Sequence, residues 1–124
     1  MPEKKILIVD DDTDVCEQVT ACLEELGYKA FSAFSGEEGL KKIQDISPNL
    51  ILLDIRMPGM DGLQVLKEIN LRFPNMVVVI MTGVHDTNIA TKAIELGACE
   101  YITKPISLND LMGRFIRPIL GDPD

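Results

Sequence analysis

Short apolar runs alternate with amphipathic stretches along this chain. Five runs have the length and composition of β-strands: residues 5–10, 29–33, 49–54, 76–81 and 99–103. The first, third and fourth are almost continuously apolar, which is typical of strands covered on both faces. The pattern therefore predicts a sheet whose central strands are buried.

The stretches between these runs carry apolar residues at helical spacing. They predict five helices, at about residues 15–26, 35–46, 63–73, 89–96 and 107–119. Ser35 and Glu38 form a capping box before the second helix, and Gly27 and Gly97 are plausible stops for the first and fourth. Pro118 should kink or end the fifth helix, because proline has no amide hydrogen to donate.

Five alternating strand and helix units predict one α/β domain, a doubly wound parallel sheet with five helices on its two faces. Five strands are too few for a (β/α)₈ barrel. The 124 residues suit a single domain, expected over residues 1–120, with residues 121–124 as a tail or the start of a linker.

The amino-acid composition and net charge exclude some classes of function. The 46% hydrophobic and 26% charged residues are typical of a globular chain, and the formal net charge of −8 argues against nonspecific binding to nucleic acid or anionic membranes. The chain shows neither a signal peptide nor a membrane-spanning run, so we expect a cytoplasmic protein. Cys16, Cys22 and Cys99 lack metal-binding spacing and are expected to be reduced, buried packing residues.

Polar residues gather where the predicted strands end. Asp10, Asp11 and Asp12 follow the first strand and Asp54 closes the third, while Thr82 and Lys104 follow the fourth and fifth. In an open parallel sheet, ligands collect beyond the carboxyl ends of the strands. The sequence therefore predicts one acidic pocket with a hydroxyl and an ammonium group.

Carboxylates without histidine or cysteine favour a hard cation, and magnesium (Mg²⁺) combines one or two carboxylates with water and phosphate oxygens. A phosphoryl group is then the natural substrate. Asp54, on a rigid apolar strand, is the best nucleophile, and Lys104 and Thr82 could contact the phosphoryl oxygens. Asp12 is better explained as a cap of the first helix.

These motifs resemble the receiver domain of two-component response regulators. They are the acids in 8–11, the stretch 53–62 around Asp54, the hydroxyl in 81–83 and the Tyr-Ile-Thr-Lys-Pro run at 101–105. The resemblance implies a flavodoxin-like strand order 2-1-3-4-5 and phosphorylation of Asp54 by a histidine kinase or phosphotransfer protein. It also implies Mg²⁺ bound by Asp11 directly, by Asp10 through water, by Asp54 and by the carbonyl of Arg56, and a cis peptide before Pro105.

The resemblance also implies a switch, in which Thr82 moves toward the phosphate and Tyr101 turns inward. The alternative for Tyr101 is a half-buried residue at the sheet edge. The face formed by the fourth helix, fifth strand and fifth helix would then contact an output domain, a partner protein or a second copy. Such a domain promotes its own phosphorylation and dephosphorylation without being a conventional enzyme. Arg56 and Val84, neither acid nor amide, are expected to make self-hydrolysis slow.

Other functions fit the residues less well. An FMN carrier of this fold needs a hydroxyl- and glycine-rich phosphate loop where this chain has three acids, and a haloacid-dehalogenase-type phosphatase needs Thr or Val where Asp14 stands. A calcium loop starting at Asp10 needs Gly where Val15 stands, and His85 alone defines no metal site. The main alternative is a receiver-like interaction module that does not cycle phosphate.

Overall fold

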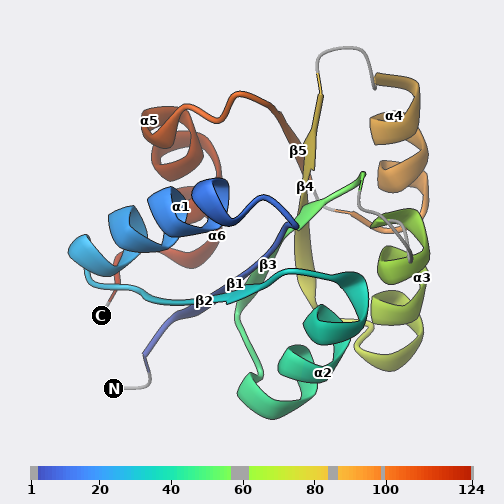
Figure 1. Ribbon diagram of the computed structural model, residues 1–124, viewed down its shortest axis with the longest axis horizontal. Helices are drawn as coiled ribbons and strands as arrows, with labels where there is room; N and C mark the ends of the chain where they lie inside the picture. The colour runs from blue at the N-terminus through green and yellow to red at the C-terminus, as the bar shows by residue number, and fades with distance from the viewer. Residues whose placement is uncertain (1–2, 57–61, 84–86, 99, 124) are drawn as a thin grey trace.

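A five-stranded parallel sheet forms the centre of the computed structural model, which describes residues 3–56, 62–83, 87–98 and 100–123 (Figure 1). The strand order is β2-β1-β3-β4-β5, which confirms the predicted doubly wound α/β fold. The strands are β1 (Lys5–Val9), β2 (Lys29–Ala33), β3 (Leu50–Asp54), β4 (Val77–Thr82) and β5 (Glu100–Thr103).

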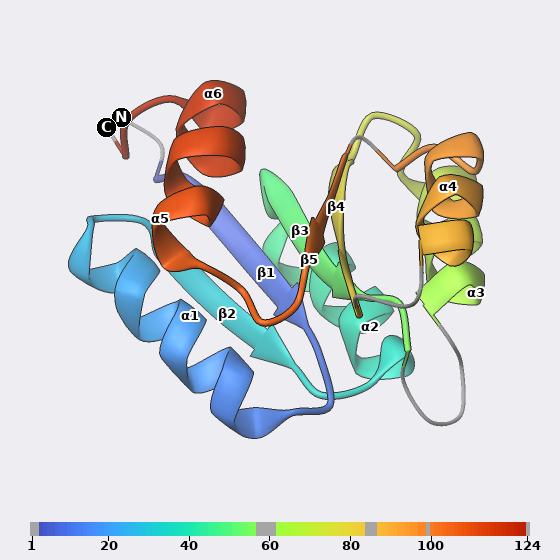
Figure 2. The same cartoon turned by 90° about the horizontal axis from the view of Figure 1, so that it is seen from above.

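Helices cover both faces of the sheet. They are α1 (Thr13–Glu25), α2 (Gly36–Ile46), α3 (Gly62–Arg72), α4 (Thr87–Glu95) and a continuous C-terminal helix made of α5 (Leu108–Asp110), η1 (Leu111–Ile116) and α6 (Arg117–Leu120). Figure 2 shows α1 and the C-terminal helix on one face, and α2, α3 and α4 on the other.

Alternate residues of the central strands supply the two halves of the core. Leu7 and Val9 pack in one cluster with buried residues of α2, α3 and α4, whereas Ile6 and Ile8 pack in a second cluster with α1 and the C-terminal helix. All four side chains are fully buried. Burial on both faces explains why β1 has no polar alternation in its sequence.

The predicted helix ends are largely confirmed. Asp12 caps α1 by accepting from the amides of Asp14 and Val15, and the Ser35 hydroxyl accepts from the amide of Glu38 at the start of α2. Gly27, two residues after the end of α1, has a φ of 100°. That left-handed conformation suits glycine, which has no Cβ to clash.

Pro118 does not end the last helix, which continues to Leu120. The six residues before Arg117 are instead wound as a π-helix, and the Arg117 amide donates to the Met112 carbonyl five residues earlier. An α-helix at this point would press the proline ring against the carbonyl four residues before it, and a wider turn relieves that contact. The helix type thus changes locally before Pro118.

Small corrections concern the strand ends. Asp10 lies just beyond β1, although its amide still donates to the Ala33 carbonyl at 3.0 Å. β3 begins at Leu50 and β4 runs from Val77 through Thr82, one residue later than predicted at these ends. Asn49 is outside β3 because its side chain accepts from the Lys5 amide at 2.7 Å. Cys99, predicted to open the fifth strand, lies outside the described residues.

Candidate functional site

The predicted site residues meet at the carboxyl edge of the sheet. Asp10 follows β1, Asp54 ends β3, Thr82 ends β4 and Lys104 follows β5. The Lys104 amide donates to the Thr82 carbonyl at 2.6 Å, and the Lys104–Pro105 peptide is cis, as expected. Parallel pairing of β1, β3, β4 and β5 therefore brings together residues that are far apart in the sequence.

Asp10 is completely buried, and both of its carboxylate oxygens have partners. Oδ1 accepts from the Asp12 amide at 2.9 Å, and Oδ2 accepts from Lys104 Nζ at 2.9 Å. The Cys16 thiol, at 3.4 Å, donates to the Asp10 carbonyl from the first turn of α1. Burial, followed by the charge of Asp10, raises the pKa of this thiol to about 11, so it remains a protonated donor.

Asp54 is the second buried carboxylate of the site. Its side chain accepts from the Arg56 amide at 3.2 Å, and Oδ2 lies 3.4 Å from Lys104 Nζ. Burial and the nearby charge of Asp10 raise the pKa of Asp54 to about 6, against the opposing effects of the Arg56 amide and Lys104. Burial penalises the charged form, which leaves an anion short of stabilising partners.

Lys104 is shared between the two acids. Burial lowers the pKa of its ammonium group, but the hydrogen bond to Asp10 and the charges of Asp54 and Asp10 outweigh burial, and the pKa is raised overall. Lys104 therefore remains a cation at neutral pH. A single ammonium group cannot neutralise both Asp10 and Asp54, which leaves the pocket with an excess of negative charge.

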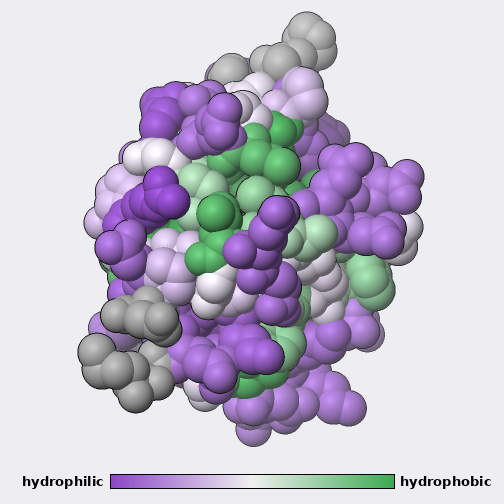
Figure 3. Space-filling model, turned by 90° about the vertical axis from the view of Figure 1, so that its left-hand side faces the viewer, coloured by the Kyte–Doolittle hydropathy of each residue, from purple (hydrophilic) through white to green (hydrophobic). Residues whose placement is uncertain are grey.

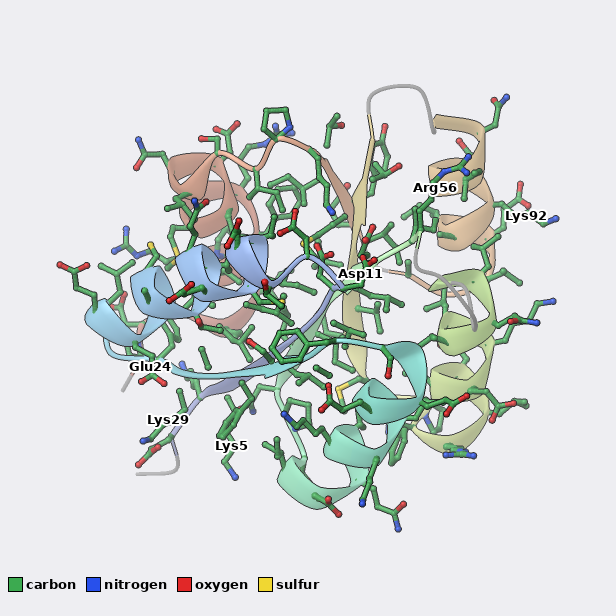
Figure 4. All side chains as sticks on the ribbon, in the orientation of Figure 1. Lys5, Asp11, Glu24, Lys29, Arg56 and Lys92 are labelled. Carbon is green, nitrogen blue, oxygen red and sulfur yellow. The ribbon has the colours of Figure 1, made fainter. Side chains whose placement is uncertain are left out.

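Asp11 completes a group of three carboxylates. One oxygen each of Asp10, Asp11 and Asp54 lies within 4.8 Å of the others. Asp11 is exposed, and Figure 4 shows it at the end of β1. Oxygen ligands of this number and charge fit a hard divalent cation, and the exposed Asp11 leaves a path from solvent. The donor set therefore fits Mg²⁺.

The remaining predicted residues have more varied positions. Thr82 is buried, and its hydroxyl lies 3.4 Å from the Gly83 carbonyl. Arg56 is exposed at the end of β3, and Tyr101 in β5 is 37% exposed, so its ring is not turned inward in this structure. Val84 and His85 lie outside the described residues.

Two of the contacts that hold Asp10 were not predicted. The Asp12 amide and the Cys16 thiol both hold Asp10, yet the sequence suggested only a helix cap and a packing residue. An Asp that accepts from the amide two residues later is a common turn, so the first contact had a sequence signal. The second had none, because any small apolar residue would satisfy the helical pattern at position 16.

A family model described as the response regulator receiver domain matches residues 6–116. The matched region contains four of the strands in full, all of β1 except Lys5, and every predicted site residue. In the described part of the chain, none of the helices combines the length and apolar character needed to cross a bilayer.

Relatives in two bacteria share much of this sequence. The chain is 36% identical to the transcriptional regulatory protein CrdR of Helicobacter pylori over 122 residues, which are 98% of the chain and 57% of that protein. It is 39% identical to the transcriptional regulatory protein ZraR of Klebsiella oxytoca over 106 residues, which are 86% of the chain and 24% of that protein. The chain thus spans little more than half of one relative and about a quarter of the other.

Solved structures agree in fold. The receiver domain of NtrX from Brucella abortus superposes with a TM-score of 0.86 at 34% identity, covering 92% of this chain and 97% of that one. A CheY-like response regulator receiver domain protein from Methanospirillum hungatei gives a TM-score of 0.88 at 34% identity, covering 95% and 94%. The acidic pocket beside Lys104 is consistent with a phosphoacceptor switch. The chain belongs to the response regulator receiver domain family.

Proposed function

We propose that this domain is a phosphorylation-dependent signalling switch and that Asp54 accepts a phosphoryl group from a histidine kinase or a phosphotransfer protein. The observation that carries the proposal is the environment of Asp54, a buried carboxylate 3.4 Å from the Lys104 ammonium and within 4.8 Å of two further acids. Such a carboxylate is held rigidly at the end of β3 and is poorly neutralised, as a nucleophile should be.

In the proposed reaction, an Asp54 oxygen forms a bond to phosphorus while the phosphorus–nitrogen bond of the phosphorylated histidine breaks. The electron pair of that bond leaves with the imidazole nitrogen. Lys104, which contacts Asp54 and Asp10 in the free protein, is close enough to pair with a phosphoryl oxygen. The Thr82 hydroxyl supplies a hydrogen bond to another oxygen of the group.

Mg²⁺ is the proposed cofactor, held by Asp11, Asp54 and the Arg56 carbonyl, with Asp10 acting through water. When bound, it would offset the charge of the incoming phosphoryl group against the carboxylates. Asp10 has both oxygens engaged by Asp12 and Lys104, which supports an indirect role for it. Exposed Asp11 is the carboxylate best able to bind the ion directly.

Phosphorylation is proposed to draw Thr82 inward, with Tyr101 following. This movement would reshape the face formed by α4, β5 and the C-terminal helix, which an output domain, a partner or a second copy then recognises. Differential affinity for the two states is required, because a ligand shifts an equilibrium only by that difference. NMR with beryllofluoride and Mg²⁺ should move the signals of Tyr101 and α4, and changes confined to the loops around Asp54 would argue against the switch.

The function is tested by labelling with acetyl phosphate. We expect one phosphoryl group per chain in the presence of Mg²⁺ and none in Asp54→Asn or with a chelator. Asp45→Asn, at an exposed position of α2, is the matched control and should label normally. Undiminished labelling of Asp54→Asn would disprove the mechanism. An unlabelled native protein that still bound its partner would favour the interaction module instead.

A further inference from the structure

The outer edge of β2 is closed by charged side chains from the neighbouring helices. In a parallel strand, the amide and carbonyl of one residue point to the same side, and successive residues alternate. The Lys29 amide and the Ala33 carbonyl are bonded toward β1, to the Lys4 carbonyl and the Asp10 amide. The backbone groups of Ala30, Ser32 and Phe34 therefore face the open side of the sheet.

Three backbone groups on this side, one from each of these residues, have a partner of matching polarity. The Ala30 amide donates to Glu24 Oε1 at 3.3 Å, and the Phe34 amide donates to Glu38 Oε1 at 2.5 Å. Between them, the Ser32 carbonyl accepts from Lys42 Nζ. Carboxylates thus meet amides, and an ammonium group meets a carbonyl. Figure 4 shows Glu24 beside the first part of β2, at the end where Lys29 lies.

The strand itself offers little defence against pairing. Residues 30–34 read Ala-Phe-Ser-Ala-Phe and include no charge, proline or glycine. Phe34 is 45% exposed, and the described residues add no strand beyond β2 in the sheet order. An uncharged edge strand with apolar side chains is a template for another chain, and proteins usually block such an edge with charges.

We propose that Glu24, Lys42 and Glu38 keep the open edge of β2 from pairing with a second copy of this chain. A second strand could bond this edge only after displacing charge-assisted hydrogen bonds. The proposal does not depend on phosphorylation, because the three contacts join α1 and α2 to β2 and to the residue after it, and involve none of the site residues.

The test is the double variant Glu24→Gln, Lys42→Met, which leaves Glu38 in place because it belongs to the capping box of α2. Its control is Glu25→Gln, Lys41→Met, at exposed neighbouring positions of the same helices and with the same net charge. Sedimentation velocity over a hundredfold concentration range should show self-association at least tenfold stronger in the first variant. Equal behaviour of the two folded variants would overturn the proposal.

Amide hydrogen exchange locates the contact and covers the case in which the double variant fails to fold. The Ser32 amide faces the open edge, so in the associated variant its hydrogen exchange should slow at least tenfold. Association that left the exchange of Ser32 unchanged would refute edge pairing. In the native protein, the Ala30 amide should exchange at least tenfold more slowly than in Glu24→Gln. Equal rates at Ala30 would show that Glu24 does not guard the edge.

Discussion

The two ends of β1 are built in opposite ways. At its carboxyl end, the buried acids Asp10 and Asp54 share one ammonium group. At its amino end, Lys4 donates to the Leu120 carbonyl and, at 2.7 Å, to the Asp122 carbonyl. Tyr28, 2% exposed, donates its hydroxyl to the Gly121 carbonyl at 2.7 Å.

The amino end of β1 contributes to stability, whereas the carboxyl end forms the candidate site. Each donor at the amino end meets an acceptor, so this end joins the C-terminal segment to the sheet. The carboxyl end holds more negative charge than Lys104 can offset, which weakens the fold. Under the proposed function, that excess charge would suit the pocket to a cation and a phosphoryl group. Figure 3 shows the side of the molecule that carries α1 and the C-terminal helix, where hydrophobic surface appears among hydrophilic side chains.

The largest change in the free energy of unfolding is expected from Asp54→Asn, because this substitution removes a buried charge that destabilises the folded state. Since burial and Asp10 raise the pKa of Asp54 from its ordinary 3.8 to about 6, ionised Asp54 destabilises the folded state at neutral pH. The net shift, which already includes the opposing effects of Lys104 and the Arg56 amide, corresponds to an expected gain of about 3 kcal/mol. Urea unfolding at pH 7 with a chelator measures it.

The pH dependence identifies the cause of this gain. Between pH 4 and 6 the folded state holds a proton on Asp54 that the unfolded state releases, so this group's contribution falls as pH rises. The advantage of Asp54→Asn should therefore be full above pH 6 and disappear near pH 4. An advantage that persisted at pH 4 would contradict the assigned cause. Asp45→Asn should be neutral throughout.

The sequence predicted the features that depend on residues close together in the chain. The bounds of α2 follow from Ser35 and Glu38 at its start, and Asp54 at the end of an apolar run marked the site. The ion pair of Lys104 with Asp10 joins residues 94 positions apart, and only the strand order brings them together. The family resemblance supplied that order, because periodicity alone predicts strands and not their neighbours.

The amino end of β1 was not predicted, for a different reason. Tyr28 and Lys4 donate to main-chain carbonyls, which every residue has, so their partners leave no trace in residue types. The segment after residue 120 was expected to be a tail or linker start. In the structure, Gly121 and Asp122 contact the sheet end through these bonds. Measuring those contacts would show whether Gly121 and Asp122 belong to the folded domain or to the tail.

A second prediction uses Mg²⁺ to compensate the charge at the carboxyl end. A ligand that binds only the folded state stabilises it, by about 1 kcal/mol at five times its dissociation constant. Asp11→Asn should lose most of this gain while unfolding like the native protein in chelator, because Asp11 is exposed and has no role in the core. Urea titrations with and without Mg²⁺ measure both. Undiminished Mg²⁺ stabilisation in Asp11→Asn would exclude it as a ligand.

At the amino end, Tyr28→Phe should lower the free energy of unfolding by about 1 kcal/mol, since it removes one partly buried hydrogen bond. Labelling by acetyl phosphate should be unchanged. Tyr101→Phe is the matched control, because Tyr101 is partly exposed, and it should alter stability by less than about 0.5 kcal/mol. If Tyr28→Phe slowed labelling as strongly as it lowered stability, the two ends of β1 would not be independent.

The smallest effect concerns the lifetime of the phosphoryl group and should leave stability untouched. Hydrolysis needs a water in line with phosphorus, and a side chain that accepts or donates a hydrogen bond can hold it there. Arg56 is exposed beside Asp54, and Val84, outside the described residues, has no polar side-chain atom. We propose that these two residues make self-hydrolysis slow.

Replacing Arg56 by Asn and Val84 by Glu together should therefore shorten the lifetime several-fold, which corresponds to about 1 kcal/mol in the barrier. Decay of the labelled protein after removal of acetyl phosphate measures the rate, with Mg²⁺ held constant. Because Arg56 is exposed, its replacement should leave the unfolding curve in chelator close to that of the native protein. A lifetime that stayed the same or lengthened would mean that water reaches phosphorus by a route these two side chains do not control.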